Sequence, residues 1–112
     1  MIDDLLDSIH EFVGAYQDKW QQNQKLNSDW NCRIKILPTD RCFEAVLVIV
    51  GGKMLLTETG KADLTLLGES EDLISLFWGA VMPSQLYKQG KIRIIGSEEA
   101  LLRLDLAIVQ IG

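Results

Sequence analysis

The stretch that most constrains the fold is residues 78–96, WGAVMPSQLYKQGKIRIIG, because each of its short parts has a clear end. Gly79 ends a helix, and Pro83 begins a second helical turn that ends at Gly90. Residues 91–95 then alternate polar with apolar side chains, as a half-buried strand does. The stretch therefore predicts a helix, a helical turn and a strand in direct succession. It contains no catalytic nucleophile, base or metal ligand, so it favours a binding module over an enzyme.

Residues 2–20 predict an amphipathic helix, with aspartates near its start, where the helix dipole favours negative charge. Its apolar stripe consists of Ile2, Leu5, Leu6, Ile9, Phe12, Val13, Tyr16 and Trp20. Residues 21–29 show no apolar period and predict a fraying helix end that passes into a loop.

The part of the chain from residue 31 to residue 67 predicts four strands separated by turns. In the first strand, buried positions alternate with solvent-exposed positions. The second is apolar at nearly every position, so we expect it to be a central strand covered on both faces. Gly51 and Gly52 can supply the positive φ values of a two-residue hairpin loop between the second and third strands. The four strands are expected at residues 31–37, 43–50, 53–58 and 62–67.

From Ser70 onward the apolar period changes from two residues to about 3.6, which predicts a helix with Ser70 as its cap. A last helix is expected after Gly96, with Ser97 as its cap and two glutamates in its first turn. Its apolar positions are too many for one face, so it needs cover from the sheet, a partner, a membrane or a ligand. These positions are Leu101, Leu102, Leu104, Ile108, Val109 and Ile111.

Composition indicates one folded domain, residues 1–112, that is large enough to bury a single core. Hydrophobic residues make up 47% and charged residues 24%, the balance of a globular protein. The net charge of −5, without a cluster of Lys and Arg, argues against a nucleic-acid partner and against firm docking on anionic lipid. No apolar run approaches the roughly 20 residues that span a bilayer, so no stable membrane insertion is expected. The acidic start differs from a secretory peptide and predicts a cytoplasmic protein.

The residue types that carry chemistry do not form a catalytic or metal-binding set. His10 lies on the polar face of the first helix with no partner fixed near it by sequence, so we expect it on the surface. Cys32 and Cys42 bracket a turn and are expected as free thiols in a reducing compartment. Two cysteines and one distant histidine are too few for a zinc site. We therefore predict no enzyme activity, no metal site and no cofactor.

Residues 79–104, GAVMPSQLYKQGKIRIIGSEEALLRL, resemble without gaps the most diagnostic segment of the sterol carrier protein 2 family. Residues 60–66 and the acidic helix start at residues 71–73 also resemble the family's strand and helix. The resemblance covers most of the chain from about residue 30 and points to a free-standing bacterial member. The matching positions in the diagnostic segment are Gly79, Pro83, Gln89, Gly90, Lys91, Ile92, Ile94, Gly96, Leu101 and Leu104.

This resemblance implies an α+β fold: a five-stranded, mainly antiparallel, strongly twisted sheet with helices mainly over one face. It also implies an apolar tunnel between the two layers that accepts fatty acids, fatty acyl-CoA, sterols or phospholipids, and a carrier rather than a catalyst. The chain departs from the family at residues 80–82, where polar or basic residues are common. Phe77, Trp78 and Leu86 are bulky and can narrow or plug such a tunnel. The last four residues, VQIG, differ from a peroxisomal address.

Two functions remain open. The first is a non-catalytic lipid carrier with a tunnel lined by apolar residues. Each of these residues would also fit a packed core. The last helix is the candidate gate of the tunnel. The second is an interaction module, in which the apolar surplus of the last helix forms a homodimer or docks on a partner enzyme. The residues expected to line the tunnel are Ile34, Ile36, Leu47, Ile49, Leu73, Leu76, Phe77, Val81, Leu86, Leu101, Leu104 and Ile108.

Overall fold

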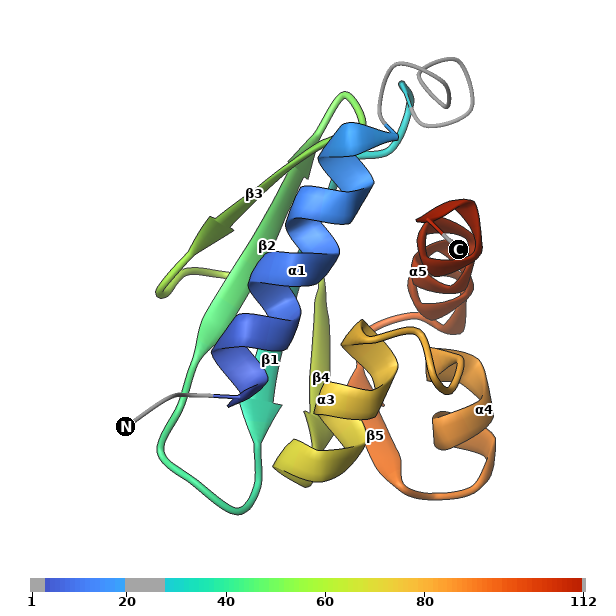
Figure 1. The fold of residues 1–112 in the computed structure, drawn as a ribbon. Coiled ribbons are helices and arrows are strands. Elements are labelled where there is room, and N and C mark those ends of the chain that lie inside the picture. Colours follow the sequence, from blue (N-terminus) through green and yellow to red (C-terminus); the bar gives the residue numbers. More distant parts are fainter. Residues whose placement is uncertain (1–3, 20–27, 112) are drawn as a thin grey trace.

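The computed structural model describes residues 4–19 and 28–111 (Figure 1). The first helix, α1 (Asp4–Asp18), forms where the sequence predicts it. Ile2 and Trp20, the first and last residues of the predicted apolar stripe, lie outside the described residues. Most of the predicted loop 21–29 also lies outside them. The apolar stripe of α1 faces the core through Leu5, Ile9, Phe12, Val13 and Tyr16, which are all buried.

The strands form one sheet in the order β3-β2-β1-β4-β5. Their bounds are β1 (Cys32–Pro38), β2 (Ala45–Val50), β3 (Lys53–Thr57), β4 (Leu64–Gly68) and β5 (Ile92–Ile95). Among the described strands, β1 and β4 run parallel, and the other three neighbouring pairs are antiparallel. The sheet is therefore mainly antiparallel, as the resemblance implies.

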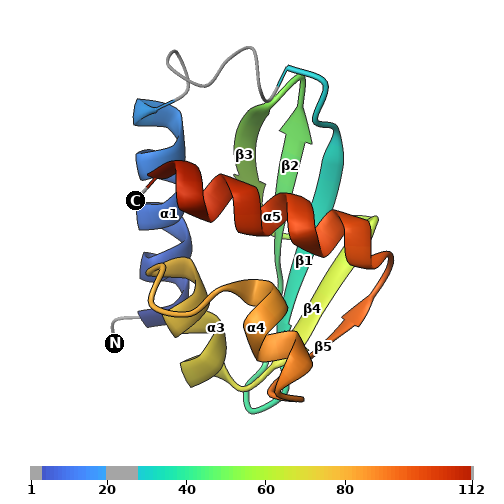
Figure 2. The same cartoon turned by 90° about the vertical axis from the view of Figure 1, so that its right-hand side faces the viewer.

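The helices form a second layer over one face of this sheet. After α1 come α3 (Ser70–Phe77), α4 (Pro83–Lys88) and α5 (Glu98–Ile111). Figure 2 shows α1 and α3 on one side of the sheet and α5 running from β5 back toward α1. α1 packs on α3, α5 and β3, while α4 packs on α5 and β5. The predicted α+β fold class, with helices mainly over one face, is confirmed.

The core lies between the sheet and the helices. Ile34 of β1 stands opposite Leu47 of β2 and Leu64 of β4, and all three side chains are fully buried. Ile36 lies on the same face of β1 and is also fully buried. Burying one such side chain contributes about 1.5–3 kcal/mol, so this inner face fixes the helices on the sheet.

The outer face of the sheet has no helix over it in the described part of the chain, which corrects the prediction for residues 43–50. That segment forms a strand only from Ala45, and β2 lies second from the edge of the sheet. On the outer face of β2, Val46 is buried and Val48 is half-buried, whereas Val50 at the end of the strand is 65% exposed. The central strand is β1, which places Arg33 and Lys35 on the outer face. An apolar run in the sequence therefore does not indicate whether one face or both faces of the strand are fully covered.

Glycines end the two short helices, as predicted. Gly79 has a φ of +78°, and its N–H donates to the carbonyl of Leu76. The N–H of Ala80 donates to the carbonyl of Ser75. These two bonds form a Schellman motif, which needs the positive φ that glycine adopts without strain. Gly90, with a φ of +74°, ends α4 in the same way.

Ser70 does not cap α3, contrary to the prediction. The helix begins at Ser70 itself, and the preceding Glu69 makes no capping hydrogen bond with its side chain. Instead, Asp40 accepts hydrogen bonds from the Ser70 hydroxyl at 2.7 Å and from the Ser70 backbone N–H at 3.0 Å. These two bonds hold the pKa of the Asp40 carboxyl below its usual value, and the bond from the hydroxyl has the larger effect. A carboxylate remote in sequence therefore satisfies the helix N-terminus.

α5 begins as predicted, because the hydroxyl of Ser97 accepts a hydrogen bond at 3.2 Å from the backbone N–H three residues later. α5 also holds α4 in place. Asp105 accepts hydrogen bonds from the backbone N–H of Ser84, at 3.0 Å, and from its hydroxyl. Near the other end of α4, the hydroxyl of Tyr87 donates to Glu98 at 3.0 Å. The two helices are therefore joined by side chains from both ends of α4.

Candidate functional site

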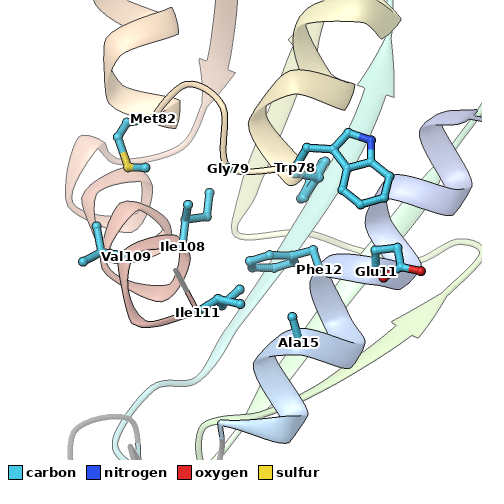
Figure 3. Close-up of a pocket in the computed structure, with 10 residues that line it drawn as sticks. Glu11, Phe12, Ala15, Trp78, Gly79, Met82, Ile108, Val109 and Ile111 are labelled. Atoms are coloured by element: carbon cyan, nitrogen blue, oxygen red, sulfur yellow. The ribbon is translucent and has the colours of Figure 1, made fainter.

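A pocket of about 360 Å³ opens between α1, the end of α3 and the second half of α5 (Figure 3). Most of its lining is apolar or aromatic. No strand residue contributes to it, so it lies among the helices and not between the two layers. Its lining residues are Glu11, Phe12, Ala15, Phe77, Trp78, Gly79, Met82, Ile108, Val109 and Ile111.

α1 supplies one wall of the pocket through Glu11, Phe12 and Ala15. Phe12 belongs to the buried stripe of the helix, and its ring lies 5.5 Å from that of Phe77 with a tilt of 56°. Such tilted aromatic pairs are favourable beyond their buried area. Figure 3 shows the ring of Phe12 directed across the pocket toward α5 and the side chain of Glu11 beside Trp78.

The end of α3 forms the second wall. The Schellman motif at Gly79 turns the chain away from α3 and leaves Trp78 at the rim, where its side chain is 56% exposed. Met82, just before α4, lines the pocket beyond this turn. A Cβ atom on Gly79 would lie 3.8 Å from the Cγ2 atom of Ile108, so this turn passes close to α5.

α5 closes the third side. Ile108 is buried against the core, whereas Val109 is 62% exposed at the rim. Val109 also continues a stripe of exposed apolar residues along the helix, with Leu102 at 53% and Leu106 at 52%. The spacing of four and three residues places this stripe on one face of α5. The predicted surplus of apolar surface on the last helix is therefore present, and it runs into the pocket rim.

A cluster of aromatic and charged side chains fastens the middle of α5 to α1 and to the turn before β1. The guanidinium of Arg103 lies 5.6 Å from the ring centre of Trp30 and pairs with the carboxylate of Asp29 at 2.9 Å. The Trp30 ring meets that of Tyr16 edge-on at 6.1 Å. The hydroxyl of Tyr16 donates to the carbonyl of Gly52. Burial raises the pKa of Tyr16, an effect that the charge of Arg103 partly offsets.

The pocket carries little chemistry of its own. Glu11 is the sole ionisable residue in the described lining, and no nucleophile stands beside it. Across the described residues, no group of three or more His, Cys, Asp or Glu could hold a metal ion. In the same residues, no helix has the length and apolar character needed to cross a membrane. His10 is exposed, and both cysteines are free, with Cys32 buried and Cys42 exposed.

A second pocket, of about 480 Å³, lies between α1 and the ends of β2 and β3. It is larger, but half of its lining is polar or charged. We take the first pocket as the candidate site because its walls are more apolar and come from three helices. The second pocket is lined by Leu6, His10, Phe43, Glu44, Ala45, Leu56, Thr57 and Glu58.

Two of the twelve residues expected to line a tunnel, Phe77 and Ile108, line the candidate pocket. Val81 is partly buried against the core. The others are buried in the core and line neither of these two pockets, so their role in ligand binding stays a prediction. They are Ile34, Ile36, Leu47, Ile49, Leu73, Leu76, Leu86, Leu101 and Leu104.

Sequence reasoning expected Phe77 and Ile108 in the tunnel wall and Trp78 as a bulky residue that can narrow it. It missed the other pocket residues, which are Glu11, Phe12, Ala15, Gly79, Met82, Val109 and Ile111. Glu11 and Ala15 flank the apolar stripe of α1, and they become pocket residues because α5 ends beside that flank. The signal in the sequence was the apolar surplus of the last helix, which indicated a surface in need of cover. It did not indicate which helix would lie opposite.

Solved structures with the same fold include small carrier proteins. Sterol carrier protein 2 from Aedes aegypti, solved in complex with palmitate, aligns over 100% of this chain and 100% of that chain with a TM-score of 0.71 and 15% identity. The apo form of sterol carrier protein 2 from Yarrowia lipolytica aligns over 98% of this chain and 94% of that chain, with a TM-score of 0.67 and 16% identity. At these identities the likeness shows the fold.

The same fold also occurs as part of an enzyme. The stereoselective inverting sec-alkylsulfatase from Pseudomonas sp. aligns with 75% of this chain, with a TM-score of 0.64 and 15% identity. The chain covers 14% of that enzyme. Among curated proteins, no sequence matches this chain. The sequence model of the SCP-2 sterol transfer family matches residues 16–107, which is most of the chain. The chain therefore belongs to the SCP-2 sterol transfer family.

Proposed function

We propose that this chain is a non-catalytic carrier that binds and transfers a hydrophobic ligand, with the ligand's tail in the pocket between α1, α3 and α5. The observation that carries the proposal is an apolar pocket of about 360 Å³ in a member of the SCP-2 sterol transfer family. The palmitate complex of the Aedes aegypti protein supports a lipid as the ligand class. Fatty acids, acyl-CoA, sterols and phospholipids are the candidates.

The pocket volume sets the length of tail that fits without a rearrangement. A methylene group occupies about the space of one water molecule, about 30 Å³, so the pocket holds about a dozen carbons. Each methylene withdrawn from water contributes about 0.8 kcal/mol, so a tail of this length contributes at most about 10 kcal/mol, when all of it is buried. The costs of association and ordering reduce this gain, and low-micromolar binding is the expected result.

Longer tails need α5 to move away from α1. Core residues expected to line a tunnel, such as Leu101 and Leu104, would reach the ligand only after this movement, because they lie on the buried face of α5. The Arg103 cluster would open with the helix. We therefore keep α5 as the candidate gate.

Native mass spectrometry of protein purified from cells tests the proposal. We expect a co-purifying lipid of defined mass on the wild-type chain. The variant Ala15→Phe places an aromatic ring inside the pocket and should lose that lipid. Gln85→Phe adds the same ring at an exposed position on α4 and should retain it. Wild-type protein that carries no lipid and binds none when lipid is added would contradict the carrier function.

A second candidate function, docking on another protein, is supported by the exposed stripe of Leu102, Leu106 and Val109. Stable interfaces bury about 800 Å² per partner, far more than three half-exposed side chains provide. A homodimer or a partner enzyme would therefore need additional surface. Sedimentation at several concentrations tests for a homodimer. A dimer that becomes monomeric in the double variant Leu102→Ser and Leu106→Ser would support docking through this stripe. A wild-type chain that is monomeric at every concentration would exclude the homodimer.

A further inference from the structure

Three features place negative charge at the mouth of the candidate pocket. The first is Glu11, whose exposed side chain is the sole ionisable group in the described lining. The other two are helix C-termini. α3 ends at Phe77, with Trp78 as its C-cap, and α5 ends at Ile111, and all three of these residues line the pocket. A helix C-terminus carries roughly half a negative charge from its aligned peptide dipoles.

No cation in the lining offsets this charge. Neither α3 nor α5 has a basic residue in its last turn. The described lining contains no Lys, Arg or His. Arg103 lies about two helical turns before the end of α5, and its guanidinium contacts Trp30 and Asp29. The net charge of −5 of the whole chain adds to the field in the same sense.

A bound amphiphile would meet this field with its head group. The apolar side chains of Phe12, Phe77 and Ile108 form the interior, so the tail lies there and the head stays at the rim, near Glu11 and Trp78. We infer that the pocket selects amphiphiles with an uncharged or cationic head group and discriminates against carboxylate and phosphate head groups. The inference rests on the proposed function, because it names the head-group class of the ligand in the same pocket. It ranks sterols and other candidates without an anionic head group above fatty acids, acyl-CoA and anionic phospholipids.

The expected size of the discrimination follows from the exposure of the rim. Two like charges about 4 Å apart in a water-like medium weaken binding about five-fold. A pocket that excludes more water would increase this factor. Added salt should reduce it, because exposed charges are screened over about 10 Å at moderate ionic strength.

The experiment compares three ligands that share a twelve-carbon tail: dodecanol, dodecanoate and dodecylammonium. Each competes at neutral pH with an uncharged fluorescent probe for the wild-type protein. We expect dodecanol and dodecylammonium to bind about five-fold or more tightly than dodecanoate. Glu11→Gln should bring the dodecanoate affinity several-fold closer to that of dodecanol, and Glu11→Lys should reverse the order.

Glu99→Gln is the matched control, because it removes the same charge from the far end of α5, about 18 Å from Ile111 by helix rise. It should leave the order of the three ligands unchanged. Equal or tighter binding of dodecanoate to the wild-type protein overturns the inference, as does a Glu11→Gln variant with unchanged ratios. Failure of all three ligands to displace the probe contradicts the proposed function instead, so the two failures are distinguishable.

Discussion

The carboxylate of Asp105 on α5 accepts two hydrogen bonds from Ser84 at the start of α4, one from the backbone N–H and one from the hydroxyl. The N-cap position of α4 is Met82, which makes no capping bond with its side chain. Asp105 therefore replaces the missing cap from another helix. α4 has only six residues, too few for stability on its own, so its position depends on this contact.

Asp105→Ala should lower the free energy of unfolding by about 1–2 kcal/mol, because it removes a charged cap and leaves the N–H of Ser84 without that acceptor. Ser84→Ala should cost less, since the backbone bond to Asp105 remains. The two substitutions should not be additive in a double-mutant cycle measured by denaturant unfolding. Additive effects would show that the two residues are not coupled.

Arg103→Met should speed ligand release. The substitution keeps an apolar stem but removes both the contact with Trp30 and the ion pair with Asp29, whose side chain is 82% exposed. Contacts of this kind contribute about 0.5–1 kcal/mol each, so the release rate should rise by about five- to thirty-fold if α5 is the gate. Stopped-flow displacement of a fluorescent lipid measures this rate. Arg93→Met, on the exposed side of β5, is the control and should leave it unchanged.

The contact between Asp40 and Ser70 predicts a loss of stability in acid. The pKa of Asp40 is lowered in the folded protein relative to the unfolded chain, where an aspartate titrates near about 3.9. Its contribution is therefore fully present above that value and is lost as the pH falls through the lowered, folded-state pKa. Asp40→Asn should be less stable than the wild type at neutral pH, and the difference should shrink below about pH 4. Denaturant midpoints measured across this range check the prediction.

Two glycine substitutions should act in opposite directions. A Cβ atom on Gly96 would lie 2.5 Å from the carbonyl oxygen of Asp63, and the φ of Gly96 is +133°. Gly96→Ala should therefore destabilise the fold by about 1–3 kcal/mol. Gly14 lies inside α1 with nothing within 4 Å of an added Cβ, so Gly14→Ala should stabilise it by about 0.5–1 kcal/mol. Thermal unfolding of both variants tests the pair, and equal shifts would contradict this account.

The parts of the fold that sequence predicted are those set by neighbouring residues. Gly51 and Gly52 adopt φ values of +57° and +80° in the predicted hairpin, because only a two-residue turn with positive φ reverses the chain there. Gly79, Pro83 and Gly90 likewise mark helix ends through their own backbone preferences.

The parts that sequence did not predict depend on residues far apart in the chain. Asp40 caps a helix that starts thirty residues later, and Arg103 meets Trp30 across most of the chain. No local pattern contains such a contact. The candidate pocket is of the same kind, since Phe77 and Ile108 were predicted from their own helices, while Glu11 joins them only through the packing of α1 on α5.

The walls of the candidate pocket belong to helices and to the turn that follows α3, whereas the strands supply the pairing that forms the sheet. The two tasks are therefore divided between separate sets of positions. Substitutions at Ala15, Met82 or Val109 can reshape the pocket without disturbing strand pairing. Evolution can in this way alter the shape of the pocket while the scaffold stays constant, which is one physical route to related chains that keep a common shape at low sequence identity.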